Sequence, residues 1–517
     1  MAGSPRWRRR VAKGAAVATA VTAGTLLLTT GVAGAVQSEP PDTSTVEGLG
    51  VATNILFVVI GAVLVIFMQA GFALVETGFC RAKHAAHVVS TNFAIFGLGF
   101  VGFFLVGYSF MFGGYGSSLL GFAAPGQNLI GSGNWTFLWW SPPALGGSGD
   151  AYTAGLMAFF LYMVAFMDTV ATIPTGSMAE RWKWESFVGW GLFVGAIYYP
   201  LFGAWTWGGG WLASLGKSIN AGFGYVDFAG SGVVHAMGGA AALAGAIVLG
   251  PRIGKYGKDG QPRTLAAHHI PMAMLGTFIL LFGWFGFNAA STLATTDIRF
   301  AVIATNTAIA GAFGATIAMF WVMLRTGKPD PGMMANGMLA GLVAITAPCA
   351  FVQPWAAAAI GIIAGVIVIE AIWIVERRFK IDDPVGAVSV HGVCGTLGVL
   401  CVGIFSDGQY GAGWNGTDLG DKGVTGILYG GTGWGQLGAQ IIGVLTIWIV
   451  MFGIVFTFFK IQNALTKGGI RAEEADELEG MDLPEMGVFA YPAFLPSEHE
   501  AIDMGLVVHQ GEPVVNG

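Results

Sequence analysis

Long apolar segments separated by short polar connections dominate the pattern of this chain. An apolar helix of about 20 residues can cross a lipid bilayer, and eleven segments of this kind follow the first 35 residues. We expect each of them to form a membrane-spanning helix. They are residues 52–77, 88–113, 153–177, 185–207, 231–250, 269–290, 300–324, 333–352, 355–376, 385–405 and 437–459.

The first 35 residues have the pattern of a secretory signal. The cationic stretch RWRRR at 6–10 precedes an apolar run rich in Ala, Val and Leu, and small residues close it at Ala33-Gly34-Ala35. This order is typical of a cleaved signal peptide. We therefore predict a signal peptide over 1–35, with an uncleaved first span as the alternative. Cleavage would leave the mature N-terminus outside the membrane.

The distribution of cationic residues sets the predicted orientation. Of the 24 Lys and Arg residues, sixteen fall in connections that would then be cytoplasmic, three in external connections and five in the signal. Cationic residues concentrate on the cytoplasmic side of membrane proteins. We therefore predict a multi-pass protein of the cell membrane, embedded in the lipid bilayer, with its N-terminus outside and its C-terminus in the cytoplasm.

Composition supports this class of protein and excludes others. The chain is 54% hydrophobic and 10% charged, whereas soluble domains carry about 25% charged residues. Its 82 glycines favour closely packed membrane helices. The net charge of −6 gives no indication of nucleic-acid binding, and the four cysteines form no CxxC pair. We therefore predict no nucleic-acid partner, no metal site and no cofactor.

A motif of the form D-x2-G-x4-H-x3-G occurs twice, at 227–239 and at 383–395. The first copy opens the fifth expected span from outside, and the second opens the tenth from inside. One motif five spans apart, entering from opposite faces, indicates inverted halves. We therefore predict an all-α polytopic membrane protein of eleven transmembrane helices, with two inverted five-helix repeats, about 51–250 and 267–405, and a final helix at 437–459.

The transmembrane domain is thus expected over 36–464, followed by a cytoplasmic regulatory tail over 465–517. Two long external connections, near 114–150 and 406–435, are rich in Gly together with Ser or Asp.

Each repeat places one histidine near the middle of the membrane. His235 and His391 lie eight residues beyond their aspartates, about 12 Å along a helix in a hydrocarbon core about 30 Å thick. A lone buried histidine is more often part of a packed core, but ionisable residues at this depth mark conduction or relay paths. If the halves pack around a twofold axis, the two rings meet and can share a proton.

Four further residues are candidates for an external site. Asp227 precedes an apolar helix, where Asp is a favoured N-cap; the alternative is a charge that attracts cations. Trp207, at the outer end of a span, can bind a cation on its face, worth about 0.5–2 kcal/mol, beside a hydroxyl such as Ser291. Phe166 and Phe287 complete the group. Ordinary interface or core packing is the alternative for these aromatic residues.

Three intramembrane acids have less defined roles. Asp168 is either functional or bonded to the segment TVATIPTG that follows it, which we expect to be broken. Glu76 and Glu370 lie near inner helix ends, and we expect them to be structural.

Seven stretches together resemble the ammonium transporter (Amt/Mep/Rh) family, over essentially the whole mature chain. The resemblance implies a homotrimer with one narrow pore in each subunit of eleven spans. The stretches are GFALVETGFCRAKH (71–84), IPTGSMAER (173–181), TWGGGWLAS (206–214), DFAGSGVVH (227–235), GWFGFNAAS (283–291), ANGMLAGLVAIT (335–346) and DDPVGAVSVHGVCG (382–395).

The resemblance also implies roles for single residues. Trp207 and Ser291 would form the outer ammonium site with Phe166 and Asp227 nearby, and Tyr162 would be a second vestibule aromatic. Phe166 and Phe287 would be a stacked gate, and His235 and His391 a twin-histidine pair. The context of Phe166 is divergent, since Met163 replaces a common glutamine of the family.

The implied activity is uptake of ammonium or methylammonium. NH4+ would bind outside and lose its proton near the gate, and NH3 would pass the histidines. The tail stretch at 470–492 resembles the segment that couples neighbouring subunits, and the inner face can bind a PII-type signalling protein. Met486 departs from the histidine of many relatives.

Two other functions are open on the sequence. Two histidines on different helices could ligate one haem of a membrane oxidoreductase. An ammonium sensor with vestigial transport would use the same pore residues.

Overall fold

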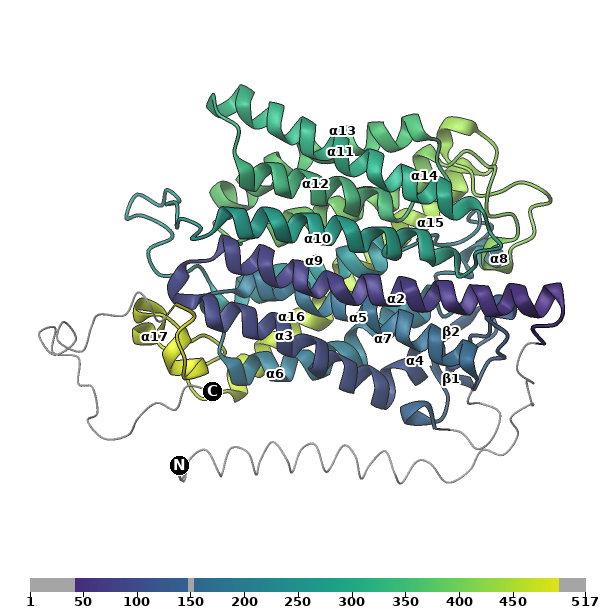
Figure 1. Cartoon of the computed structure of the whole chain (residues 1–517), viewed down its shortest axis with the longest axis horizontal. Coiled ribbons are helices and arrows are strands. Elements are labelled where there is room, and N and C mark those ends of the chain that lie inside the picture. Colours follow the sequence, from purple (N-terminus) through teal and green to yellow (C-terminus); the bar gives the residue numbers. More distant parts are fainter. Residues whose placement is uncertain (1–41, 147–152, 492–517) are drawn as a thin grey trace, which may run out of the picture.

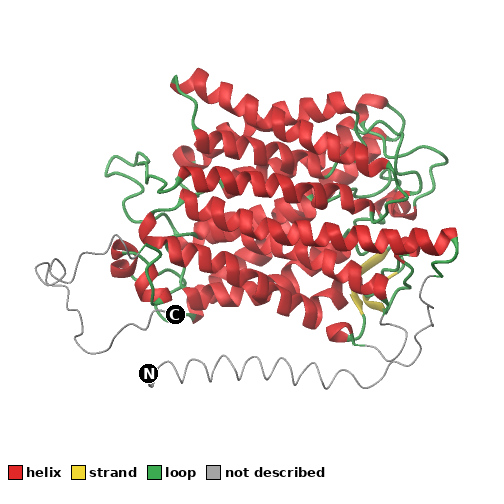
Figure 2. Cartoon of the chain, in the orientation of Figure 1, coloured by secondary structure: helices red, strands yellow, loops and turns green. Residues whose placement is uncertain are grey.

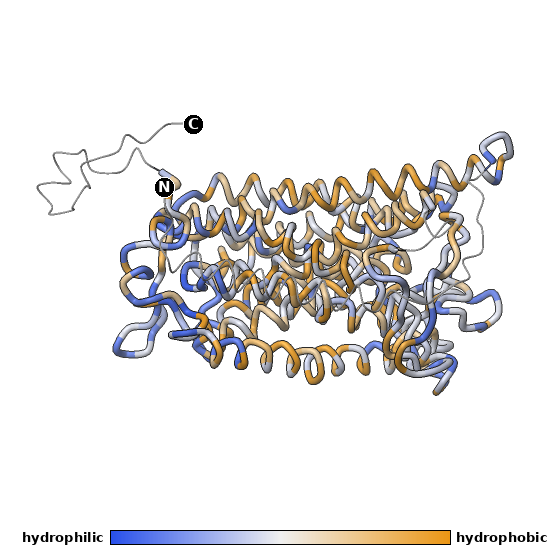
Figure 3. Tube along the Cα trace, turned by 90° about the horizontal axis from the view of Figure 1, so that it is seen from below, coloured by the Kyte–Doolittle hydropathy of each residue, from blue (hydrophilic) through white to orange (hydrophobic). Residues whose placement is uncertain are grey.

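The computed structural model describes residues 42–146 and 153–491. The predicted signal peptide over 1–35 and the last part of the tail lie outside these residues. The described chain is a bundle of helices that run side by side along its long axis (Figures 1 and 2). Hydrophobic residues occupy the middle of the bundle, and hydrophilic residues gather at its two ends (Figure 3). This is the distribution that a bilayer around the bundle requires.

Ten helical segments of the described chain are long and apolar enough to cross a membrane. Several are interrupted by single π-helical turns, so that two labelled helices form one span. The helices are α2 (Val46–Phe79), α3 (Ala85–Gly102), α4 (Tyr108–Phe112), α5 (Ala154–Met178), α6 (Trp184–Phe193), α7 (Tyr199–Trp205), α8 (Leu215–Ile219), α9 (Met237–Leu249), α10 (Ile270–Ala289), α11 (Arg299–Thr326), α12 (Pro331–Thr346), α13 (Pro354–Trp373), α14 (Cys394–Phe405), α15 (Gly433–Leu445), α16 (Phe452–Leu465) and α17 (Glu474–Glu479).

The eighth expected span, 333–352, forms a shorter helix than the sequence predicts. Helix α12 has 16 residues, about 24 Å at 1.5 Å per residue. The apolar residues 347–352 continue as buried turns, and other elements satisfy their backbone. Asn306 donates to the carbonyls of Cys349 and Val352, at 3.0 and 2.9 Å. With α12 included, the described chain has the eleven helices of the predicted fold.

Within residues 42–146 and 153–491, a small β-hairpin is the one clear departure from an all-α fold. Strands β1 (Gln127–Ser132) and β2 (Trp135–Trp140) pair antiparallel, within the external connection predicted at 114–150. The hairpin lies at one end of the bundle (Figure 2). The backbone N–H of Trp211 donates to the carbonyl of Thr136 at 3.0 Å, which ties the hairpin to the segment that follows α7.

The two copies of the repeated motif enter the bundle from opposite ends and cross at backbone contact. A Cβ atom added to Gly239 would lie 2.2 Å from Cα of Gly392, and one added to Gly395 would lie 2.5 Å from the carbonyl oxygen of Ser231. Only glycine allows so close an approach. The motif glycines therefore fix how the inverted halves meet.

The C-terminal segment packs back on one end of the bundle, which we call the tail end. The backbone N–H of Ala472 donates to the carbonyl of Arg181 at 2.9 Å, and that of Lys183 donates to Ile470 at 3.0 Å. Helix α17 lies there, whereas α8 and the hairpin lie at the opposite end (Figure 1). We call the opposite end the vestibule end.

Candidate functional site

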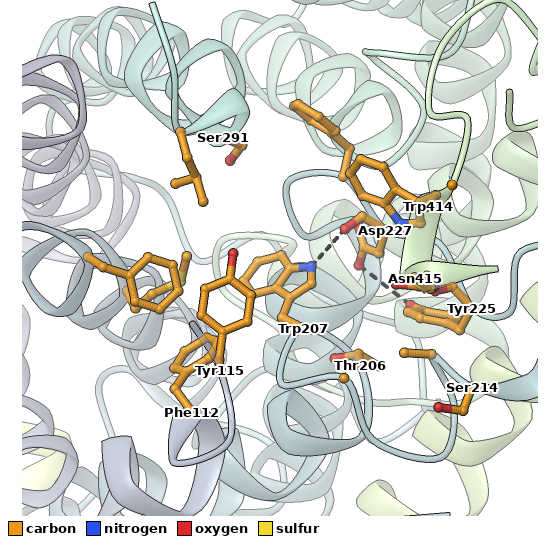
Figure 4. A pocket seen from close by; sticks show the side chains of 18 of the residues that line it. Phe112, Tyr115, Thr206, Trp207, Ser214, Tyr225, Asp227, Ser291, Trp414 and Asn415 are labelled. Carbon is orange, nitrogen blue, oxygen red and sulfur yellow. Dashed lines mark hydrogen bonds between the residues drawn. The ribbon is translucent and has the colours of Figure 1, made fainter. Parts of the chain in front are cut away.

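A pocket of about 620 Å³ opens at the vestibule end. Aromatic residues and a few polar groups line it (Figure 4), which is typical of a binding site for a small molecule. The structure places five of the predicted site residues or their neighbours in its wall: Tyr162, Phe166, Trp207, Asp227 and Ser291.

Trp207 is held in place by its indole N–H. This group donates to the backbone carbonyl of Asp227 at 2.7 Å (Figure 4). The ring meets Phe166 edge to face, with centroids 5.6 Å apart at 80°. Because the N–H is already bonded, the indole offers the pocket its π face rather than a donor.

Ser291 provides an acceptor on the pocket wall. Its hydroxyl donates to the carbonyl of Phe287 at 2.8 Å, so the lone pairs of Oγ remain available. Tyr162 Oη lies 3.1 Å from Ser291 Oγ and also bonds the carbonyls of Gly286 and Phe287. An aromatic face and a hydroxyl acceptor in one pocket suit a small cation that carries N–H groups.

A pair of phenylalanines closes the bottom of the pocket. The rings of Phe166 and Phe287 have centroids 4.2 Å apart and planes inclined by 33°. Both residues are buried, at 1% and 0% exposure. Contact this close leaves no open passage, so anything that passes must displace at least one ring.

The two repeated histidines lie directly beyond this pair of phenylalanines. His235 stacks on Phe287, with centroids 5.5 Å apart, and on Trp284, at 5.1 Å. The Nδ1 atoms of His235 and His391 are 3.1 Å apart, so one donates to the other. Among the described residues, His235 Nε2 has no hydrogen-bond partner. The pair thus forms a polar point within an otherwise apolar stretch.

Both histidines sit in π-helical turns, η6 (Ser231–Ala236) and η9 (Val388–Val393). Such turns are rare and occur frequently at functional sites. In each copy the motif aspartate caps the turn. Asp227 accepts from the backbone N–H groups of Gly230, Gly232 and Val233, all at 2.8 Å. Asp383 accepts from Ala387 and Val388, at 3.0 and 2.7 Å.

This capping limits what Asp227 can do in the pocket. Its carboxylate is 3% exposed and committed to three backbone groups. Burial raises the pKa of this carboxyl, although the backbone N–H groups favour its anion. Asp227 thus binds the first N–H groups of the turn with its side chain, as a capping residue does, although the N-cap residue itself is Gly230.

Of the remaining acids, Asp168 lies in different surroundings from those expected, and Glu370 is as expected. Helix α5 runs unbroken through Pro174, so the expected broken segment after Asp168 is wrong. Asp168 Oδ1 is buried without a hydrogen-bond partner among the described residues, and nothing in the structure explains it. Glu370 pairs with Arg325 and accepts from the indole of Trp321, as expected of a structural residue.

Sequence reasoning missed an ion network at the tail end. Arg252 is 4% exposed and bonds Asp382 at 2.8 Å and Glu180 at 3.1 Å. Arg81 bonds Glu180 as well, at 2.5 Å. Burial opposes ionisation of these acids, but Arg181 and Arg252 hold the pKa of Asp382 far below its usual range. Arg252, His84 and Arg81 likewise lower the pKa of Glu180.

The chain is similar to known proteins along most of its length. Residues 56–491 match the family model of the Ammonium Transporter Family. Ammonium transporter Amt2 of Archaeoglobus fulgidus is 45% identical over 450 residues, which cover 87% of this chain and 89% of that protein. Ammonium transporter Amt1 of Haloferax mediterranei is 35% identical over 458 residues, 86% of this chain and 80% of that protein.

Solved structures of similar proteins have the same overall fold as this chain. A protein described as Sensor Amt Protein superposes with a TM-score of 0.73 at 33% identity, covering 85% of this chain and all of that chain (100%). Mep2 of Candida albicans superposes with a TM-score of 0.68 at 28% identity, covering 86% of this chain and 93% of that one.

Proposed function

Because this chain belongs to the ammonium transporter family, we propose that it moves ammonium across the cell membrane through one pore in each subunit. The pore runs from the vestibule pocket, past the Phe166–Phe287 gate, to the histidine pair. The observation that carries the proposal is the Nδ1–Nδ1 contact of 3.1 Å between His235 and His391, directly behind the gate. It is a transporter rather than an enzyme.

Binding in the vestibule uses attraction to a cation. The face of Trp207 attracts NH4+ by its quadrupole, and Ser291 Oγ accepts one N–H. Entry beyond the gate strips water from the ion, so the charge becomes expensive. Ammonium escapes this cost by leaving its proton behind, and neutral NH3 passes the histidines with hydrogen bonds to their nitrogens.

Selectivity follows from the same cost. K+ and Na+ have no proton to release, so each would have to carry its full charge through an apolar constriction. Methylammonium can be deprotonated and is expected to be a substrate as well.

The setting of this pore in the cell completes the proposal. The vestibule end faces outward after signal cleavage over 1–35, and the tail end faces the cytoplasm. The functional unit is a homotrimer, and the tail over 465–517 regulates it together with a PII-type protein.

The geometry argues against one of the two alternative functions, the haem oxidoreductase, and leaves the sensor as a candidate. A bis-histidine haem needs its macrocycle between the two imidazoles, but these rings have centroids 5.2 Å apart and nitrogens in hydrogen-bonding contact. A sensor function remains a second candidate, because one similar structure carries that description. Substrate flux separates the two, since a sensor with vestigial transport moves little ammonium.

The proposal is tested by flux into liposomes that contain the purified protein. An inward ammonium gradient should produce an ammonium-dependent current and a change of internal pH, and an equal K+ gradient should produce neither. Liposomes that respond no more than protein-free ones would refute transport.

Removing the π face of the vestibule should weaken binding. In Trp207→Leu, the half-saturating ammonium concentration should rise roughly two- to thirtyfold, which corresponds to about 0.5–2 kcal/mol of cation–π attraction. Trp434→Leu is the matched control, because Trp434 is 75% exposed and outside the pocket. An unchanged concentration dependence in Trp207→Leu would exclude Trp207 from the site.

Reversing the charge of a lysine at the pocket should strengthen ammonium binding, the opposite of the effect of Trp207→Leu. Lys217 lines the pocket and is exposed, so it repels an approaching cation. In Lys217→Glu, the half-saturating concentration should fall roughly two- to fivefold at low ionic strength. The difference should shrink in about 1 M salt, where the screening length is about 3 Å. Lys422→Glu, outside the pocket wall, should leave the half-saturating concentration unchanged at both salt concentrations.

A further inference from the structure

Glu76 is a buried acid beside the pathway that the mechanism above does not use. It lies in the last turn of α2 and is 2% exposed. It lines a cavity of about 20 Å³ together with His391, Asn336 and apolar side chains. A cavity needs about 10–15 Å³ to hold one water molecule. One water can therefore stand between the carboxyl of Glu76 and the ring of His391.

The partners of Glu76 are all neutral hydrogen-bonding groups. Asn92 Nδ2 donates to Oε2 at 2.6 Å, and Thr175 Oγ1 lies 2.9 and 2.8 Å from the two carboxyl oxygens. Among the described residues, no Lys or Arg forms an ion pair with Glu76. Another acid, Asp383, acts on it by charge repulsion. A structural carboxylate at this depth would need a cation.

The geometry around Thr175 admits a protonated Glu76. Thr175 Oγ1 also lies 2.5 Å from the carbonyl of Thr172. A hydroxyl has one proton and can donate to one acceptor at a time. If that proton goes to Thr172, the contact with Glu76 is satisfied when Glu76 donates its own. The site therefore suits both the charged and the neutral carboxyl.

The surrounding network holds the carboxyl in one position. Asn92 uses its second amide proton on the carbonyl of Val88, at 3.1 Å, and its Oδ1 accepts from Thr172 at 3.0 Å. Gln69 donates to Thr172 and to the carbonyl of Asn92. On the other side, a Cβ atom on Gly176 would lie 3.1 Å from Glu76 Oε1. Such support from several elements is what a proton-transfer site requires.

We propose that Glu76 is the proton acceptor on the tail side of the histidine pair, reached from His391 through one water molecule in this cavity. This inference rests on the transport function proposed above. It gives the proton released by ammonium a defined destination, separate from the path of NH3.

The proton moves from ammonium to Glu76 in three transfers. An N–H bond of ammonium breaks, and the proton binds Nε2 of His235. The Nδ1 proton of His235 moves to Nδ1 of His391, and the Nε2 proton of His391 moves through the water to a carboxylate oxygen of Glu76. NH3 and both rings end neutral, with the tautomers exchanged, and Glu76 becomes a neutral acid. Glu76 then releases the proton to tail-side water. Each ring regains its first tautomer by proton exchange with water, which takes the proton from one nitrogen and returns one to the other.

The test compares charge movement with NH3 movement in the same liposomes. In Glu76→Gln, the ammonium-dependent current should fall at least about tenfold, the loss expected of a removed proton acceptor. NH3 should still enter and make the interior more alkaline. Glu370→Gln, at the half-buried pair with Arg325, is the matched control and should keep its current.

A second variant tests the water rather than the carboxyl. Ala387→Val adds two methyl groups to the wall of the cavity and leaves Glu76 and His391 in place. Ala387→Val should lower the current in the same way. This test still holds if the Glu76→Gln protein fails to fold.

The outcomes separate this inference from the proposed function. Normal current in Glu76→Gln or in Ala387→Val would overturn the inference. A folded Glu76→Gln protein that loses both the current and the entry of NH3 would overturn it as well. If the wild-type protein itself gives neither current nor NH3 entry, transport fails and the inference fails with it.

Discussion

Replacing both pore histidines with alanine should cut the ammonium-dependent current by about 100-fold, since positioned proton-transfer groups contribute roughly 10²–10⁴ to a rate. His235 and His391 are the polar groups that meet behind the gate, with nitrogens 3.1 Å apart. In His235→Ala/His391→Ala, an NH4+ ion behind the gate has no histidine nitrogen to accept its proton. The measurement is the current across reconstituted membranes after an ammonium pulse, normalised to the amount of protein.

The control for this variant is His268→Ala. His268 lies at the tail end, where it contacts the carbonyl of Cys80 at 2.8 Å and Tyr491 at 2.7 Å, and it is not part of the pore. Its current should match the wild type. If the double variant keeps a full ammonium current with unchanged exclusion of K+, the histidine pair is not the relay and the mechanism proposed here is wrong.

Arg252→Ala should destabilise the protein by about 3–5 kcal/mol, because one change leaves two buried acids short of a partner. Asp382 and Glu180 are both fully buried, at 0% side-chain exposure, and both bond this guanidinium. Thermal unfolding in detergent, followed by tryptophan fluorescence, should show a clearly lower transition temperature. Arg325→Ala removes a pair with 47% and 32% exposed side chains and should cost only about 0–1 kcal/mol. Equal transition temperatures for the two variants would contradict this account.

The same network predicts how acid affects stability. The pKa values of Asp382 and Glu180 are lower in the folded protein than in the unfolded chain. The stabilisation is therefore complete above the unfolded values, near pH 4, and is lost as the pH falls through the lower folded values. Arg252→Ala should lose less stability than the wild type over that acid range.

The hydrophobic pattern predicted most of the bundle, and its failures have local causes. The eighth span was expected to reach residue 352, because hydropathy does not distinguish a buried helix from buried turns. Residues 347–352 are apolar in both cases, but side chains such as Asn306 satisfy their carbonyls. The hairpin over 127–140 was missed because its strands lie in a Gly-rich connection whose pairing depends on contacts with the segment after α7.

The residues of the candidate site also differ in how far the sequence alone could predict them. The histidine pair followed from a repeated spacing, D-x2-G-x4-H-x3-G, together with the count of spans. Trp207 and Phe166 required the family resemblance, because 17 Trp and 37 Phe give periodicity nothing to select. Glu180, Arg252 and Asp382 carry no local pattern at all. They are joined only by the folding of distant connections onto one end.

The backbone crossing of the motif glycines bears on how this protein works over time. Transporters that alternate between two faces rock one repeat against the other around the substrate. Here Gly239 and Gly392 touch through their main chains, so the halves are interlocked where such a hinge would have to open. The side chains that block the pathway are the rings of Phe166 and Phe287, whose centroids are 4.2 Å apart. In the proposed mechanism each passage then requires rotation of these buried side chains, while the backbone frame of the two halves stays fixed.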